Sequence, residues 1–280
     1  MHWQTTRFRV DLARPQVMGI VNVTPDSFSD GGAHASAAAA IAHCRQLLAD
    51  GADILDIGGE STRPGSQPVC VDEELARVLP VLDAALQLGC PVSIDTSKPQ
   101  VMAAVLARGA DIVNDINALQ APGALDAVAA HPRCGVCLMH MRGTPESMQQ
   151  WPHYADVVDE VEAFLREREA ALRARGIDAE RISFDPGIGF GKSVAHNIEL
   201  LRRQRELLAK LGPGRPLLVG WSRKSTLGAI TGRDVGQRQA ASVAAALAAV
   251  QSGARIVRVH DVAATVDALK VWQAAGLLNG

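Results

Sequence analysis

The tetrapeptide Gly51-Ala52-Asp53-Ile54 recurs as Gly109-Ala110-Asp111-Ile112 and, with one change, as Gly253-Ala254-Arg255-Ile256. Each copy follows a helical pattern and opens a short apolar run, and glycine suits the left-handed conformation that ends a helix. The three glycines are 58 and 144 residues apart, which corresponds to two and four strand–helix units of roughly 30–36 residues. Such repetition predicts parallel strands joined by right-handed crossovers.

Eight short runs rich in β-branched residues recur along the chain, separated by helical patterns. Helix starts are indicated by Ser97-Lys98-Pro99, Ala121-Pro122 and Ser193, because Ser caps a helix and Pro suits its first turn. Eight units in 280 residues predict one closed (β/α)8 TIM barrel. Residues 1–16 are expected to form a short N-terminal extension, such as a hairpin across the barrel bottom. An open doubly wound sheet is the alternative, since strand number alone does not prove closure. The predicted strands are Val17–Asn22, Ile54–Gly58, Val92–Asp95, Ile112–Asp115, Val136–His140, Ile182–Asp185, Leu217–Gly220 and Ile256–His260.

The composition narrows the range of functions. Twenty-eight basic and 30 acidic residues leave a formal charge of −2, which disfavours binding to nucleic acid or to an anionic membrane. The N-terminus lacks the apolar run of a signal peptide, and five cysteines, an odd number, suit a reducing compartment. No linker rich in Pro, Gly or Ser divides the chain. We therefore expect one cytoplasmic domain over residues 1–280.

Two motif-like stretches do not meet the requirements of the motifs they resemble. Cys134-Gly135-Val136-Cys137 leads into a predicted strand, whereas a redox C-x-x-C places its first Cys at a helix N-terminus. The stretch Pro186–Ser193 ends like a P-loop, but Pro186 occupies the position of the first required glycine. Redox, zinc and NTPase functions are disfavoured accordingly.

Polar residues follow the predicted strands, where a barrel builds its active site. Asp95, Asn114, Asp185 and Lys224 combine carboxylates, an amide and a cation. This set suits a flat heterocycle with amino, ring N–H and carbonyl groups, because a carboxylate can accept two parallel N–H bonds. A second set is cationic and indicates a phosphate site near the last strands: Arg63, Arg223, Lys224, Arg258 and His260.

Several longer motifs resemble those of the dihydropteroate synthase family, folate-pathway enzymes that join 4-aminobenzoate to a dihydropterin pyrophosphate. The resemblance runs from the first predicted strand to the last and so covers essentially the whole chain. The matching stretches are Met18–Gly32, Asp56–Gly65, Ile94-Asp95-Thr96, Asn114-Asp115, His140–Gly143, Phe184–Lys192, Ser222-Arg223-Lys224 and Arg258–Asp261.

The resemblance implies a pterin-binding transferase with Mg²⁺ as cofactor, and it implies roles for individual residues. Asp95, Lys224 and Arg63 would be catalytic. The pterin would be held by Asp95, Asn114, Asp185 and Lys224; the pyrophosphate by Asn22, Arg63, Arg258 and His260, with Asn22 touching the metal; and the aminobenzoate by Phe28, Thr62, Arg63, Pro64, Phe190 and Ser222.

The resemblance also implies a homodimer that acts on small-molecule substrates and is a target of sulfonamides. We expect pyrophosphate to depart before the amine attacks, because aniline nitrogen is a modest nucleophile and the dihydropterin can delocalise positive charge. Two alternatives remain at this point. One is a pterin-binding methyltransferase, which would not need the cationic set; the other is a catalytically silent barrel with an interaction role.

Overall fold

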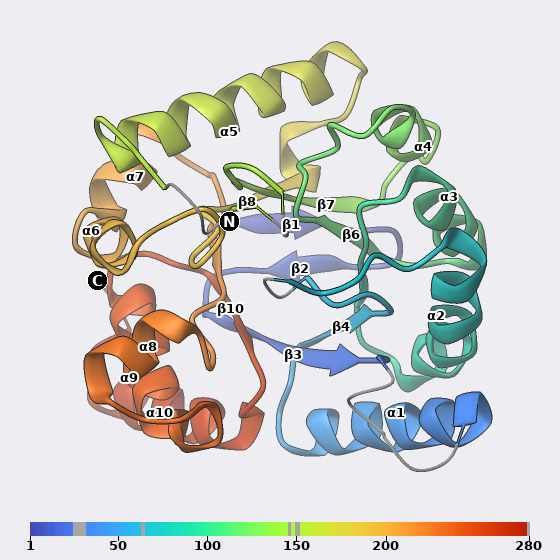
Figure 1. Cartoon of the computed structure of the whole chain (residues 1–280), viewed down its shortest axis with the longest axis horizontal. Helices are drawn as coiled ribbons and strands as arrows, with labels where there is room; N and C mark the ends of the chain where they lie inside the picture. Colours follow the sequence, from blue (N-terminus) through green and yellow to red (C-terminus); the bar gives the residue numbers. More distant parts are fainter. Residues whose placement is uncertain (25–31, 63–64, 145–146, 149–151, 279–280) are drawn as a thin grey trace.

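The chain folds into a barrel of eight parallel strands that is encircled by helices (Figure 1). A computed structural model describes residues 1–24, 32–62, 65–144, 147–148 and 152–278. Neighbouring strands follow the order β8-β7-β6-β5-β4-β3-β10-β9, and one parallel bridge between Phe184 and Leu217 joins its two ends. The predicted TIM barrel is confirmed, and the open sheet is excluded. Its strands are β3 (Gln16–Asn22), β4 (Ile54–Gly58), β5 (Val92–Asp95), β6 (Ile112–Asp115), β7 (Gly135–Met139), β8 (Ile182–Asp185), β9 (Leu218–Val219) and β10 (Ile256–Val259).

The helices begin largely where the sequence signals place them. Pro99 opens its helix, and Ser193 caps another in a capping box with His196. The prediction from Pro122 is wrong, since that helix begins at Ala124 after Gly123, whose positive φ turns the chain. The helices are α1 (Gly32–Ala49), α2 (Val71–Ala85), α3 (Pro99–Arg108), α4 (Ala124–Ala129), α5 (Val157–Ala174), α6 (Val194–Arg202), α7 (Gln204–Leu211), α8 (Ser225–Thr231), α9 (Gln239–Gln251) and α10 (Val262–Ala274).

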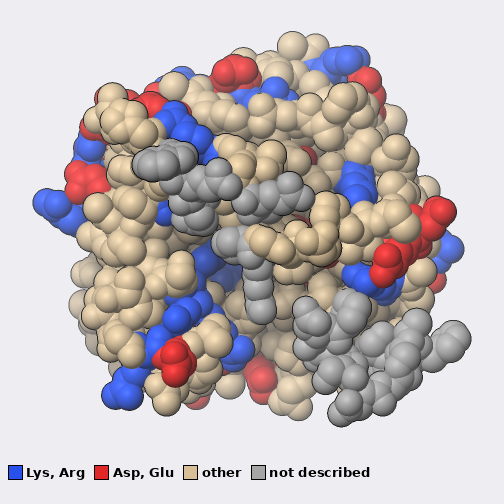
Figure 2. All heavy atoms as spheres, in the orientation of Figure 1, with Lys and Arg blue, Asp and Glu red and all other residues tan. Residues whose placement is uncertain are grey.

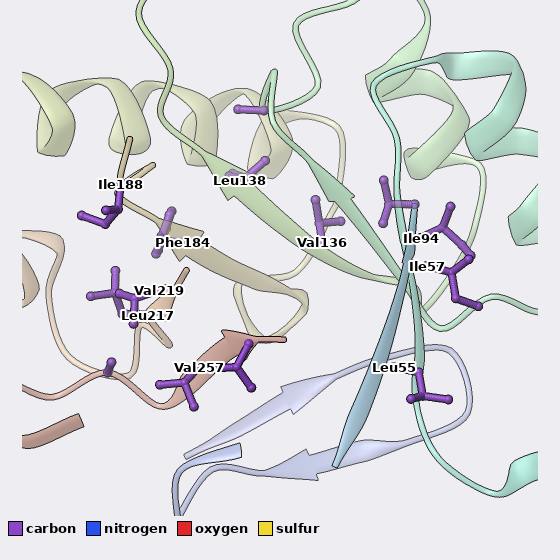
Figure 3. Packing of buried hydrophobic residues seen from close by; sticks show 14 of the residues in the cluster. Leu55, Ile57, Ile94, Val136, Leu138, Phe184, Ile188, Leu217, Val219 and Val257 are labelled. Carbon is purple, nitrogen blue, oxygen red and sulfur yellow. The ribbon is translucent and has the colours of Figure 1, made fainter. Parts of the chain in front are cut away.

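Alternation along each strand separates two apolar layers. Side chains such as Leu55, Val136 and Phe184 belong to the large cluster between the barrel and the helices (Figure 3). The intervening residues point into the barrel, where a smaller cluster includes Ile54, the first residue of β4, and Cys137, in the middle of β7. Aliphatic side chains therefore fill the bottom, and polar side chains are left for the other end.

The N-terminal extension is a hairpin, as predicted. β1 (His2–Gln4) pairs antiparallel with β2 (Arg9–Asp11). Trp3 is fully buried in the smaller cluster, and its indole N–H donates to the carbonyl of Arg181 over 2.9 Å. The hairpin thus closes the end of the barrel where the strands begin.

The C-x-x-C stretch has no redox geometry. Cys134 packs in the outer cluster and Cys137 in the inner one, and all five cysteines are free. Burial raises the pKa of both thiols. Within the described residues, no helix is long and apolar enough to cross a membrane.

Candidate active site

Four inward-facing side chains form a connected group near the C-terminal ends of the strands. Nε of Arg258 lies 2.6 Å from Oδ2 of Asp56, and its Nη2 lies 2.8 Å from Oδ2 of Asp95. The amide of Asn114 lies 3.3 Å from Oδ2 of Asp56. Four strands, β4, β5, β6 and β10, therefore contribute to one polar network inside the barrel.

Burial sets the electrostatics of this network. It raises the pKa of Asp95 to about 7, although the charge of Arg258 opposes the rise. Burial disfavours the charged form of Arg258 as well, but Asp56 and Asp95 outweigh it and raise the guanidinium pKa. Asp95 can therefore change its charge near neutral pH while Arg258 keeps its own.

A second part of the site lies around β8 and the turn after β9. Oδ1 of Asp185 accepts a 2.7 Å hydrogen bond from the Gly187 amide, and burial raises the Asp185 pKa. Nζ of Lys224 lies 4.1 Å from the centroid of the Phe190 ring. Burial lowers the pKa of Lys224 to about 8, against the attraction of Asp185.

Ser222 and His260 meet at the ends of neighbouring segments. Oγ of Ser222 lies 3.0 Å from Nδ1 of His260 and accepts from the His260 backbone amide over 3.1 Å. Arg223, grouped with the phosphate-binding cations by sequence, has a positive φ of 59° and pairs with Asp261 at 2.6 Å. Figure 2 shows Lys and Arg atoms gathered on this face over α8 and α9.

The predicted site residues fall into three groups. Eight belong to the barrel end described above. Asn22 is half-buried at the end of β3, and Thr62 is half-buried within the segment after β4. Phe28, Arg63 and Pro64 lie outside the described residues. The eight are Asp95, Asn114, Asp185, Phe190, Ser222, Lys224, Arg258 and His260.

Two polar residues have a place in the site that the sequence did not assign. Asp56 is fully buried and bonds both Arg258 and Asn114. Asn197, on α6, accepts from the Gly189 amide and donates to Thr226 Oγ1, each over 2.9 Å. A carboxylate at an inward strand position was the available signal for Asp56; Asn197 looks like any helix residue.

Lys192 is a buried support rather than a phosphate ligand. Its Nζ lies 2.8 Å from Nδ1 of His140 and within 3.2 Å of three carbonyl oxygens, those of His140, Gly187 and Phe190. Burial lowers the pKa of Lys192 well below its usual range. Burial, together with the nearby charge of Lys192, lowers the pKa of His140 to about 2. The P-loop interpretation is therefore excluded by position as well as by pattern.

Metal binding by a protein cage has no support in the described part of the chain, where no three His, Cys, Asp or Glu residues cluster. The amide of Asn22 offers one hard oxygen donor. Mg²⁺ commonly keeps waters and takes substrate phosphates as its remaining ligands. A single amide is thus compatible with a magnesium ion that arrives with its substrate.

Comparison with known proteins places this chain in a family. The family model described as pterin binding enzyme matches residues 18–260. A dihydropteroate synthase of Neisseria meningitidis serogroup C is 53% identical over 278 residues, or 98% of each chain.

Two solved structures are similar over almost their full length. The Xanthomonas albilineans dihydropteroate synthase with 4-aminobenzoic acid has a TM-score of 0.91 and 52% identity, covering 99% of both chains. The Burkholderia cenocepacia dihydropteroate synthase complexed with 7,8-dihydropteroate has a TM-score of 0.89 and 51% identity, covering 98% of this chain and 96% of that one. With its polar barrel end and a family match over most of its length, the chain belongs to the pterin-binding enzyme family.

Proposed function

We propose that this chain is a dihydropteroate synthase, a transferase that converts (7,8-dihydropterin-6-yl)methyl diphosphate and 4-aminobenzoate into 7,8-dihydropteroate and pyrophosphate. The observation that carries the proposal is the joined set of Asp95, Asn114, Asp185, Lys224 and Arg258 in one barrel end. Relatives of the same length are solved with 4-aminobenzoate and with dihydropteroate.

The pterin ring fits the inner half of the site. Asp185 and Asn114 face the barrel interior from β8 and β6, and each offers an acceptor for ring amino or N–H groups. Lys224 supplies a donor for a ring nitrogen or carbonyl. Asp95 lies beside them and completes the proposed pterin set, with Arg258 holding its carboxylate at 2.8 Å.

The diphosphate fits the outer, cationic side. Arg258 and His260 come from the end of β10, near Asn22 on the adjacent strand β3. Arg63 is assigned here from the sequence alone. Asn22 would hold Mg²⁺, which, when bound, would neutralise charge on the departing diphosphate.

The aminobenzoate fits against Thr62, Ser222 and Phe190. The Ser222 hydroxyl is fixed by His260, and the Phe190 ring lies against Lys224, so both groups border the proposed pterin pocket. Phe28, Arg63 and Pro64 join this set on sequence grounds.

The proposed reaction begins with cleavage of the bond between the pterin methylene and the diphosphate oxygen. The bonding electrons leave with pyrophosphate, and the dihydropterin carries the positive charge. Asp95, when ionised, stabilises this cation electrostatically. The aniline nitrogen then forms the new C–N bond and releases one proton to solvent, which balances charge.

The direct test is to incubate the purified chain with Mg²⁺, the dihydropterin diphosphate and 4-aminobenzoate and to measure dihydropteroate by mass spectrometry. Formation of product is expected, and a folded protein without product would contradict the proposal. The methyltransferase alternative is tested by thermal unfolding, since pyrophosphate should stabilise a synthase.

We also propose a homodimer located in the cytoplasm. The apolar residues Ile230 and Val271 are 55% and 66% exposed on α8 and α10, which supports a second copy of the chain packing there. The five free cysteines support the cytoplasm, because they suit a reducing compartment. Light scattering at micromolar concentration should give twice the chain mass; a monomer would contradict the dimer.

A further inference from the structure

The segment between β4 and α2 is closed at its base by a carboxylate. Oε1 of Glu60 accepts a 2.8 Å hydrogen bond from the backbone amide of Val69. This bond ties the two ends of residues 60–69 together. Thr62, two residues after Glu60, lies inside the ring so formed, and Ser66 Oγ donates to the Ser61 carbonyl across it.

Lys98 joins this ring to two helices. It precedes α3 as its N-terminal capping position, and its Nζ lies 2.6 Å from Oε2 of Glu60 and 2.6 Å from Oε2 of Glu74 on α2. We call Glu60, Val69, Glu74 and Lys98 the clasp. It links the segment after β4 to α2 and to the start of α3 through one ammonium group.

The clasp is sheltered from solvent. The side chains of Lys98, Glu60 and Glu74 are 20%, 18% and 0% exposed, and ion pairs are screened less as burial increases. Burial disfavours the Lys98 ammonium, but its bonds to Glu60 and Glu74 raise its pKa overall. Oε1 of Glu74 is buried without a hydrogen-bond partner in the described structure, so Lys98 is its main electrostatic compensation.

Close packing fixes the start of the segment as well. A Cβ added to Gly59 would lie 2.8 Å from Val78 Cγ2 and 3.2 Å from the Glu74 carbonyl oxygen, so α2 packs directly on the backbone there. Arg77 Nη1 also donates to the Gly59 carbonyl over 2.8 Å. The clasp therefore acts on a backbone already held against α2.

We propose that Glu60 and Lys98 are positioning residues for the aminobenzoate half of the site. This inference rests on the proposed function, which places Thr62 against 4-aminobenzoate. Both residues act through the described parts of the segment, residues 60–62 and 65–69, because their bonds are made to Val69, Glu74 and each other. A small displacement of a positioned group is costly in rate and binding. The pterin residues Asp95, Asn114 and Asp185 are carried by the strands β5, β6 and β8 rather than by this segment.

The test compares variants of the clasp in the full chain. Glu60→Gln keeps the side-chain size and removes the charge that Lys98 meets, and Lys98→Met removes the ammonium. We expect the KM for 4-aminobenzoate to rise by about tenfold and the KM for the dihydropterin diphosphate to stay within about twofold. Lys98→Arg, which keeps the charge, should restore most of the aminobenzoate KM.

Two further variants control for misfolding and for the loss of an ion pair between the same two helices. Lys98→Met combined with Glu74→Gln removes the uncompensated buried carboxylate and guards against misfolding. Asp83→Asn is the matched control, because Asp83 also joins α2 to α3, through Arg108 at 2.5 Å, yet both side chains are about half exposed. Neither KM should change in the control.

Hydrogen exchange at the Val69 amide gives a readout that needs no turnover. Exchange should accelerate in Glu60→Gln and Lys98→Met and stay unchanged in Asp83→Asn. An unaltered aminobenzoate KM, or an equal rise in both KM values, would overturn the inference. If the unmodified chain makes no dihydropteroate, the proposed function fails, and exchange at Val69 still tests the clasp.

Discussion

Nη2 of Arg258 donates to Oδ2 of Asp95 over 2.8 Å, and this bond joins the last strand of the barrel to the third. The same guanidinium bonds Asp56 through Nε at 2.6 Å. One cation thus holds two carboxylates in place. Of these charges, that of Asp95 changes with pH near neutrality.

The rate should depend on pH in a bell-shaped manner. The Asp95 pKa is raised to about 7, so Asp95 gains a proton and loses its charge as pH falls below that value. The Lys224 pKa is lowered to about 8, so Lys224 loses its charge above it. We expect kcat/KM for the dihydropterin diphosphate to be highest between these values. Asp95→Asn should lack the acid limb, and a flat profile from about pH 6 to 9 would contradict both assignments.

Replacing the Phe190 ring should move the alkaline limb. The ring lies 4.1 Å from Nζ of Lys224 and favours its charged form. In Phe190→Leu, the Lys224 pKa should fall, shifting the alkaline limb downward by about half a pH unit or more. Phe8→Leu is the control, since Phe8 contacts a cation, Arg7, from the hairpin. A limb that stays in place in Phe190→Leu would argue against the contact.

The N-terminal hairpin should contribute stability without affecting chemistry. Trp3 is fully buried and donates to Arg181, so Trp3→Ala should lower the free energy of unfolding by about 3–5 kcal/mol. Urea unfolding measures this, and kcat at a permissive temperature should be unchanged. Arg9→Ala, in the same hairpin but 58% exposed, should have little effect. A large loss of kcat in folded Trp3→Ala would contradict a purely structural hairpin.

Gly187 should tolerate no side chain. Its φ is +69°, and an added Cβ would lie 1.8 Å from the His140 carbonyl oxygen, the same carbonyl that Lys192 contacts. Gly187→Ala should therefore displace the turn that carries Phe190 and abolish most activity. Gly176→Ala is matched, with φ of +78° and nothing within 4 Å, so it should cost only the left-handed strain of about 1–2 kcal/mol. Similar thermal shifts for the two variants would refute this reading.

The barrel could be predicted from sequence because each strand is a short buried run bounded by a helix signal. Six of the eight strands begin and end as predicted or differ by one residue at one end. β9 is shorter than predicted because only Leu218 and Val219 pair regularly with β10. The strand-end residues Asp95, Asn114 and Asp185 could be named because barrel topology alone brings them together.

The supports of the site could not be predicted in the same way. Asp56 could be noticed as a carboxylate at an inward strand position, but its partner Arg258 is 202 residues away and could not be identified. Lys192 belongs to a phosphate-like motif, yet its Nζ is surrounded by carbonyl oxygens. Such contacts depend on the directions of side chains in three dimensions, which the spacing of residues along the sequence does not reveal. The binding and catalytic roles of all the site residues stay predictions, and Phe28, Arg63 and Pro64 lie outside the described residues as well.

The single bridge between Phe184 and Leu217 gives the barrel a seam. Every other junction in the ring is a continuous ladder of paired strand residues, so the wall is weakest between β8 and β9. Asp185 ends β8 on one side of this seam, and Lys224 follows β9 on the other side. A ligand bound to both residues would connect β8 to β9 across this junction. Ligand binding and closure of the barrel wall would therefore be coupled.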